Sequence, residues 1–394
     1  MSITRSISTL IVILVLSPAI VPAASAASEL KVFPREDKKM TDPQTGAELL
    51  FLTTAPSKET NLYFHERSWL ADESLILFNS DRKDGGLMGY ITATGELVRL
   101  AELGSATAAA LDNHIYGIRK DKVIELSLEV KKSEDPSKRS TVTATERVIC
   151  ELPKGVHTTA LNASCDGKQL ACGFGGGEAA SSGVYVMDIA GGTVRTLCEV
   201  PKEIGYAGHI QWSRTNPNLL SFAGIVQRLW VVDVRDGVPK NPYAHRKDEL
   251  VTHESWWVDD QMLFCGGVHT KPQEDSHVKI LNITTGQVRI IGEGSWWPGA
   301  TASELAKRNW WHAAGSADGK WVAADNWHGG IMLFEGKTTR PHLLTSGHRT
   351  YGKGEHPHVG WDRMGKQVIF ASHLLVDANI CVATIPAEMQ KANE

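Results

Sequence analysis

Residues 312–323 read His-Ala-Ala-Gly-Ser-Ala-Asp-Gly-Lys-Trp-Val-Ala, which is a strand, a tight turn and a second, apolar strand. Asp and Gly favour the turn, and β-rich runs bounded by such residues are typical of antiparallel strands. The same sequence motif recurs along the chain. Its other copies begin at His65, His157, His209, His253 and His358, and a degenerate copy covers 107–118.

Successive copies lie about 44 to 59 residues apart. This is the length of one four-stranded blade, and similarity at a roughly fixed period indicates a repeat fold. Seven copies fit the chain, so the sequence predicts an all-β, seven-bladed β-propeller with TolB- or WD40-like blades. We expect the strand at 48–52 to supply the outer strand of the last blade and so close the ring. A tandem of β-sandwiches is the rival fold, although its sequence would not repeat the motif at such even intervals.

The N-terminus has the features of a secretory signal peptide. Arg5 provides the positive charge, residues 10–16 are an unbroken apolar run, and Ala24-Ser25-Ala26 is a small-residue cleavage site. We expect cleavage after Ala26, which leaves 27–394 as a single propeller domain in the periplasm or outside the cell. No later apolar run approaches about 18 residues, so we expect no membrane anchor.

Net charge and composition indicate which classes of binding partner the sequence disfavours. The 394 residues carry a formal net charge of −4, and no basic stripe is present, which argues against nucleic acid. The six cysteines have no CxxC spacing and mostly lie in apolar, strand-like runs. Some could pair in an oxidising compartment, or they could be buried thiols, and the sequence predicts no particular bridge.

Two segments stand outside the repeat. Residues 131–140 are polar and predict an exposed hairpin loop. Residues 296–310 lengthen one blade connection, contain a predicted helical turn at 303–307, and could cover a site. Tryptophan pairs occur at 256–257, 296–297 and 310–311. They either stack on sugar rings or pack between blades, and the pair at 296–297 is the best candidate for stacking because it lies in the insertion.

The histidines of the repeat suggest a site. The first strand of every propeller blade lines the central channel, so residues at one repeat phase should converge on one mouth: His157, His209, His253, His312 and His358. In His356-Pro357-His358 the proline favours an extended backbone, which points the two imidazoles to the same face. Two or three imidazoles would hold Mn²⁺, Zn²⁺ or a similar divalent cation and would leave other coordination positions of the ion open. The alternative is a structural histidine that the repeat has inherited.

These motifs together resemble a known family. Arg228-Leu229-Trp230, Thr252-His253-Glu254-Ser255-Trp256, His312 and His356-Pro357-His358 are similar to motifs of the oligogalacturonate lyases, which are seven-bladed polysaccharide lyases. Ser80-Asp81-Arg82 and His209-Ile210-Gln211-Trp212-Ser213 extend the resemblance, which covers roughly residues 45–386.

The resemblance implies a role for each matching residue. His312, His356 and His358 would bind manganese or another divalent cation, and His253 would be the general base, with Arg228 beside the substrate acid and base. Arg82, His209 and Lys353 are the predicted substrate-binding residues.

Lys353 is also a departure from the family, which has a glutamine ligand at that position. A protonated lysine cannot bind a metal. Either Glu355 or water replaces the ligand, or the metal is weaker or absent, and Lys353 could pair with a substrate carboxylate. The insertion before His312 is a second departure and could reshape the substrate groove.

The chemistry fits these residue types. In a uronate polymer the C5 proton lies α to a carboxylate, and a metal on that carboxylate spreads the enolate charge. An arginine can clamp the carboxylate and a histidine can take the proton. The sequence therefore predicts cleavage of short, pectin-derived uronate oligosaccharides by β-elimination. The alternatives are a non-catalytic, TolB-like periplasmic binding protein, whose histidines would not meet, and a lyase that acts on a different acidic sugar.

Overall fold

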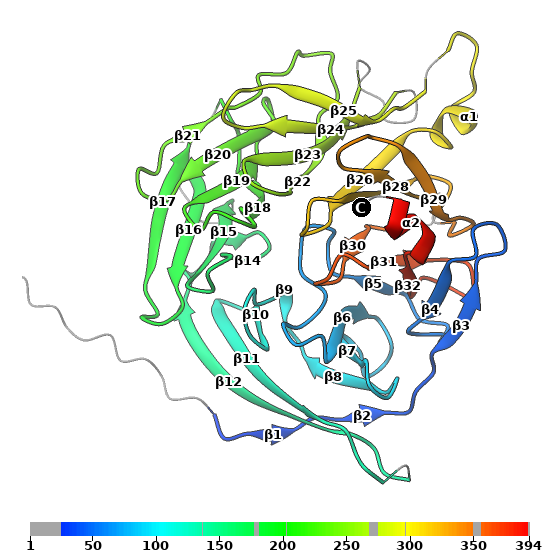
Figure 1. The fold of residues 1–394 in the computed structure, drawn as a ribbon. Helices are drawn as coiled ribbons and strands as arrows, with labels where there is room; N and C mark the ends of the chain where they lie inside the picture. The colour runs from blue at the N-terminus through cyan, green and yellow to red at the C-terminus, as the bar shows by residue number, and fades with distance from the viewer. Residues whose placement is uncertain are drawn as a thin grey trace, which may run out of the picture.

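The computed structural model describes residues 25–135, 137–176, 181–201, 203–267, 275–295, 297–349 and 356–392. In this part of the chain seven antiparallel sheets form a ring around a common centre (Figure 1). The prediction of an all-β, seven-bladed propeller is confirmed. Most of the predicted signal peptide, Trp296, Lys353 and Glu355 lie outside the described residues.

Blades 1 to 3 come from the first half of the chain. Blade 1 contains β5 (Glu59–Asn61), β6 (Leu75–Ser80), β7 (Gly86–Ile91) and β8 (Leu97–Ala101). Blade 2 contains β9 (Gly104–Ala108), β10 (His114–Arg119), β11 (Lys122–Lys131) and β12 (Thr141–Glu151). Blade 3 contains β13 (His157–Thr158), β14 (Asn162–Ala163), β15 (Gln169–Gly175), β16 (Ser182–Asp188) and β17 (Val194–Val200).

Blades 4 to 6 follow the repeat in order. Blade 4 contains β18 (Gly208–Trp212), β19 (Leu219–Ala223), β20 (Leu229–Asp233) and β21 (Pro239–Lys240). Blade 5 contains β22 (Thr252–Trp256), β23 (Gln261–Gly266), β24 (His277–Asn282) and β25 (Val288–Gly292). Blade 6 contains β26 (Trp310–Gly315), β27 (Trp321–Asn326), β28 (Ile331–Glu335) and β29 (Pro341–Thr345).

Blade 7 joins the two ends of the chain. It contains β30 (Gly360–Trp361), β31 (Gln367–Ser372), β32 (Asn379–Thr384), and β4 (Glu48–Phe51) from near the N-terminus. Leu50 of β4 pairs with Val382 of β32, as predicted for the closing strand. Three further strands then line outer edges: β1 (Ser28–Glu29) on blade 2, β2 (Val32–Phe33) on blade 1 and β3 (Lys38–Thr41) on blade 7.

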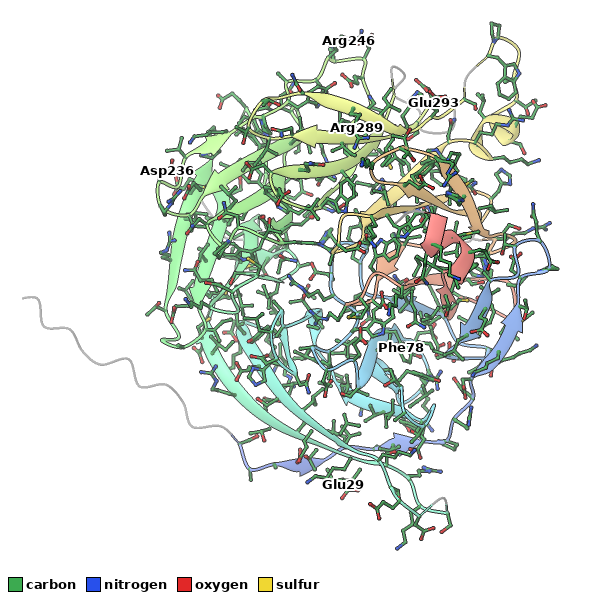
Figure 2. The ribbon with its side chains drawn as sticks, in the orientation of Figure 1. Glu29, Phe78, Asp236, Arg246, Arg289 and Glu293 are labelled. Atoms are coloured by element: carbon green, nitrogen blue, oxygen red, sulfur yellow. The ribbon has the colours of Figure 1, made fainter. Side chains whose placement is uncertain are left out.

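The core lies between neighbouring blades. Leu220 and Phe222 of blade 4, for example, pack with Ala171 and Val184 of blade 3, and all four are fully buried. Figure 2 shows Phe78 inside the ring, whereas the charged Asp236 and Arg246 project at its outer rim. Alternation along each strand therefore places apolar side chains between sheets and polar ones in solvent.

Blade 1 departs from the repeat at its inner strand. Asn61 pairs with Phe78, and the next pairing is the bridge between Trp69 and Ile76. Residues 62–67 therefore leave the sheet, and most of them are buried near the centre of the ring. The copy of the motif that begins at His65 does not start with a regular strand, because residues 62–67 leave the sheet there.

Several smaller predictions are also confirmed. The described residues between β11 and β12, 132–135 and 137–140, are mostly exposed. A short helix, α1 (Ala302–Ala306), lies in the insertion, where Thr301 and Glu304 form a capping box. A second helix, α2 (Ala387–Ala392), ends the described chain. Neither helix of the described chain has the length and apolarity needed to cross a membrane.

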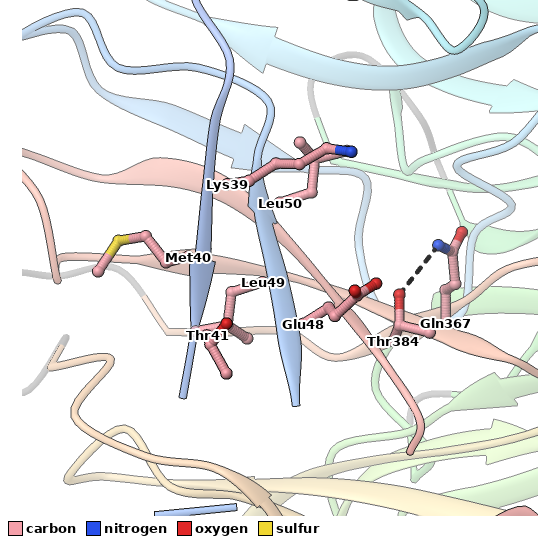
Figure 3. A pocket seen from close by; sticks show the side chains of 8 residues that line it. All are labelled: Lys39, Met40, Thr41, Glu48, Leu49, Leu50, Gln367 and Thr384. Carbon is pink, nitrogen blue, oxygen red and sulfur yellow. Dashed lines mark hydrogen bonds between the residues drawn. The ribbon is translucent and has the colours of Figure 1, made fainter. Parts of the chain in front are cut away.

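All six cysteines are free, and five of them are buried. A surface depression of about 270 Å³ lies on blade 7 and is lined by β3, β4, Gln367 and Thr384, whose side chains Figure 3 shows. None of the predicted site residues lines it, so the predicted chemistry belongs elsewhere.

Candidate metal centre at the inner strands

The histidines on the inner strands sit in repeated β-bulges. In β18, three residue steps from Gly208 to Gln211 face two steps on the neighbouring strand, and β22 and β26 show the same irregularity. His209, His253 and His358 have φ of 48°, 50° and 50°, which is the left-handed region that non-glycine residues rarely adopt. A bulge re-aims a side chain, and strained backbone of this kind is concentrated at functional sites.

Three histidines form a group able to hold a metal ion. One ring nitrogen from each of His312, His356 and His358 lies within 4.8 Å of the other two. Ligands about 2.1 Å from one ion are separated by at most about 4.2 Å, so small side-chain rotations would complete the set. An all-imidazole donor set suits a divalent transition ion, so the residues fit the predicted cofactor.

Asp325 fixes the geometry of this group from β27. Its carboxylate accepts hydrogen bonds from the backbone N–H groups of His312 (2.8 Å) and His358 (3.0 Å). The His312 Nδ1 atom lies 2.9 Å from Asp325 Oδ2, which leaves Nε2 of His312 for a metal. This carboxylate–histidine contact orients metal ligands in many proteins. Burial raises the pKa of Asp325 to about 6, and the nearby His358 and the two backbone bonds oppose that rise.

His253 lies beside the three-histidine group. Its ring centroid is 4.2 Å from that of His312 and 4.3 Å from that of Trp311. Burial lowers the pKa of His253 well below its usual value, and the electrostatic influence of neighbouring groups, including His312 and Arg228, lowers it further. The imidazole is therefore held in its neutral form.

Arg228 reaches the same region from the start of blade 4's third strand. Its Nε and Nη2 atoms donate to the two carboxylate oxygens of buried Glu254, at 2.8 and 3.3 Å. Nη1 makes no hydrogen bond to the described part of the chain. Arg228 is therefore a charge anchored by Glu254, with one donor group left for a ligand.

The excursion of blade 1 forms the floor of the cluster. The Tyr63 ring lies 5.0 Å from that of His358 and 5.4 Å from that of His209, and Phe64 lies 5.3 Å from His312. Trp311 and Trp327 form an aromatic wall, with Trp327 4.7 Å from His356. The Tyr63 and Phe64 rings from a turn in blade 1, two indole rings and five imidazoles thus meet where blades 1, 4, 5, 6 and 7 converge.

Two histidines of the predicted cluster lie apart from His253, His312, His356 and His358. His209 lies at the edge of the cluster against Tyr63, and burial lowers its pKa to about 4. His157 shares the repeat phase but is exposed and has no ring contact with the cluster in the described chain. The inner strand of blade 3 is split into β13 and β14, which moves His157 away from the centre.

Arg82 is engaged elsewhere in blade 1. Its guanidinium pairs with Glu36 at 2.8 Å and with buried Glu59, and it also bonds to Ser80. No contact joins it to the histidines within the described residues, so its predicted substrate role stays a prediction.

Sequence reasoning missed Asp325 and the two residues of the floor, Tyr63 and Phe64. Asp325 has a signal: it ends the apolar run Trp321-Val322-Ala323-Ala324, and a charged residue in a buried strand requires a partner. Tyr63 had none, because its place depends on an excursion that the repeat pattern does not reveal.

The fold and site thus define a seven-bladed β-propeller with a three-histidine candidate metal centre at the inner strands. Among solved structures, an oligogalacturonate lyase in complex with manganese matches 92% of this chain and all of its own, with a TM-score of 0.71 at 15% identity. The oligogalacturonate lyase of Vibrio parahaemolyticus matches over the same shares, with a TM-score of 0.69 at 16% identity.

Another solved structure matches less well. U3-55K covers 88% of this chain and all of its own, with a TM-score of 0.54 at 12% identity. No family model matches the sequence, and no curated protein matches it. At these identities the likeness shows the shared fold, and activity has to be argued from the site.

Proposed function

We propose that this protein is an oligogalacturonate lyase-like enzyme that cleaves short uronate oligosaccharides by metal-assisted β-elimination. The observation that carries the proposal is the meeting of His312, His356 and His358, beside His253 and near Arg228. The rival hypothesis of a non-catalytic binding propeller predicts that these histidines do not meet. The overall similarity to two oligogalacturonate lyases, which is greater than the similarity to U3-55K, supports the same proposal.

Each residue has a part in this proposal. His312, His356 and His358 would hold a divalent cation such as Mn²⁺, which supplies charge stabilisation at the carboxylate beside the scissile bond. His253 accepts the C5 proton through its neutral imidazole. The Nη1 group of Arg228 donates to the same carboxylate, and Glu254 prevents the guanidinium from turning away.

The elimination balances without a further reactant. The C5–H bond breaks with its proton going to His253, a double bond forms between C4 and C5, and the C4–O bond breaks with O4 leaving. The leaving O4 takes a proton from water. We also propose, from the N-terminal signal, that the enzyme acts in the periplasm or outside the cell on an acidic oligosaccharide.

The test is turnover of digalacturonate and trigalacturonate by the purified protein, with added Mn²⁺ or with EDTA. We expect the substrates to disappear with Mn²⁺ and to persist with EDTA. Assays on other uronate dimers, such as those of glucuronate or mannuronate, distinguish a lyase for a different acidic sugar. Absence of turnover on every uronate, together with absence of bound metal, would overturn the proposal.

A further inference from the structure

A second cluster of charged side chains lies at the other end of the inner strands. His209 stands at the start of β18, and Arg214 follows the end of that strand. In blade 7, His358 precedes β30 and Arg363 follows it. Because a strand rises about 3.3 Å per residue, the five residues of β18 separate the two ends by roughly 15 Å. The arginines therefore belong to a different mouth of the ring from the histidines.

Three arginines from three blades converge there. Arg67 Nη1 donates to the carbonyl oxygen of Ala163 (3.5 Å), and the neighbouring Asn162 accepts from the N–H of Trp212, two residues before Arg214. Arg67 is also two residues from Trp69, whose carbonyl oxygen accepts from Arg363 Nη2 at 2.6 Å. Segments of blades 1, 3, 4 and 7 thus bring Arg67, Arg214 and Arg363 together across the centre.

These guanidinium groups have no acidic partner in contact. None of the three forms an ion pair within the described chain, although other partly buried arginines, such as Arg82, Arg147 and Arg228, each bind a carboxylate. Arg363 donates to backbone carbonyl oxygens, which satisfy its N–H groups but carry no net charge. Arg214 makes no hydrogen bond within the described chain.

The buried carboxylate of Glu66 does not act as the missing acidic partner. Glu66 attracts Arg67 and Arg214 electrostatically, but its Oε1 is bound by His65 (3.0 Å) and Asn162 (2.9 Å), and its buried Oε2 makes no hydrogen bond to the arginines or to any other described residue. Burial lowers the pKa of Arg214 and of Arg363 to about 10, and repulsion from Arg67 lowers both further, yet all remain charged at neutral pH. Glu73 and Asp112 also attract Arg363 electrostatically, but no carboxylate of the described chain forms an ion pair with any of the three guanidinium groups, so the arrangement favours an anion in direct contact with them.

We propose that Arg67, Arg214 and Arg363 form a binding site for a small oxyanion, a phosphate or a carboxylate group. The planar fork of a guanidinium matches both groups, and Arg214 offers all its N–H donors. The anion would supply the missing counter-charge and would join blades 1, 4 and 7 at this mouth. The site is independent of the proposed lyase chemistry, because it shares none of its residues with the histidine cluster.

Calorimetric titration of the folded protein with sodium phosphate tests the site, in buffer of constant ionic strength without added metal. We expect saturable binding of one phosphate per chain, weakened at least tenfold by Arg214→Gln. Arg235→Gln is the matched control, because Arg235 is exposed in the same blade and paired with Asp233. It should bind phosphate as the wild type does.

A parallel titration with galacturonate separates the two sources of oxyanion. Binding that Arg214→Gln abolishes identifies a sugar carboxylate as a ligand of this site, whereas binding that only His312→Ala abolishes belongs to the histidine cluster. If neither anion binds, or if both bind Arg214→Gln as tightly as the wild type, the proposal is wrong. Should Arg214→Gln not fold, the anomalous signal of selenate in wild-type crystals decides: a peak between the three guanidinium groups supports the site, and its absence overturns it.

Discussion

Asp325 fixes the relative positions of two histidines of the proposed metal centre, His312 and His358. It contacts both His312 and the backbone of His358 from inside a buried strand. We predict that Asp325→Asn lowers the affinity for Mn²⁺ by 10- to 100-fold, because the amide neither carries the charge nor orients the imidazole as the carboxylate does. Calorimetric titration with Mn²⁺ measures this. Asp318→Asn, in an exposed turn of the same blade, is the control, and equal affinity in both variants would contradict the assignment.

His253 is the residue on which the proposed proton transfer depends. His253→Ala should reduce turnover of digalacturonate by about 10²- to 10⁴-fold, because a positioned base contributes about that much. The three-histidine group is intact in this variant, so Mn²⁺ should still bind. His157→Ala, at the same repeat phase but exposed, should keep full activity. Undiminished turnover in His253→Ala would move the base elsewhere.

His348 gives the fold a dependence on pH that is separate from the site. It is buried between Ser372 and Thr345, and burial lowers its pKa to about 4. The unfolded chain binds a proton near pH 6.5, so the contribution of neutral His348 is complete above that pH and is lost as the pH falls toward 4.

The expected size of this loss is about 3 kcal/mol. We predict that the free energy of unfolding falls less steeply between pH 6.5 and 4.5 in His348→Gln than in the wild type, as measured by urea denaturation. The other buried histidines are present in both proteins and cancel in the comparison. Parallel pH profiles would show that His348 does not titrate in this way.

At the scale of secondary-structure elements, the repeated motif predicted the inner strands but not their bulges. Periodicity places residues on one face of a strand, whereas a bulge adds one residue and re-aims the side chain that follows. The phase of His209, His253, His312 and His358 was therefore readable from sequence, and the positive φ of three of them was not. His157 shows the limit of phase alone, since a split strand removes it from the cluster.

The N-terminal strands differ in what they hold together. The β4 strand closes the ring through blade 7, whereas β1 and β2 add short fifth strands to blades 2 and 1. We predict that removing residues 1–35 lowers the melting temperature by a few degrees, while removing residues 1–53 prevents folding because blade 7 loses its outer strand. Thermal denaturation followed by circular dichroism compares the two. Cooperative folding without β4 would contradict this account of ring closure.

At the scale of the molecule, the number of blades and the closing strand were predictable because each repeat carries its own turn and strand signals. The convergence of the histidines followed from the ring geometry once the repeat was recognised. Tyr63 and Asp325 were not predicted, because their positions depend on contacts between blades that are far apart in sequence. The arginines at the other mouth were missed for the same reason.

Metal binding should stabilise the whole ring. The proposed ligands come from blade 6 and from the chain entering blade 7, so a bound cation links two blades. Mn²⁺ at 100 times its dissociation constant should add about 2.7 kcal/mol to the free energy of unfolding. Denaturation with Mn²⁺ and with EDTA measures the difference, and His312→Ala should abolish it. An equal gain in His312→Ala would place the metal at another site.

The most direct test of the central claim is the mass of the products formed from digalacturonate in ¹⁸O-labelled water. Elimination adds no water, so the two product masses should sum to the mass of the substrate, with no ¹⁸O introduced by bond cleavage. Mass spectrometry reads this even if the unsaturated product rearranges, provided that products are sampled early, before carbonyl exchange. Products whose masses sum to the substrate plus one labelled water would show hydrolysis and would contradict the proposed lyase.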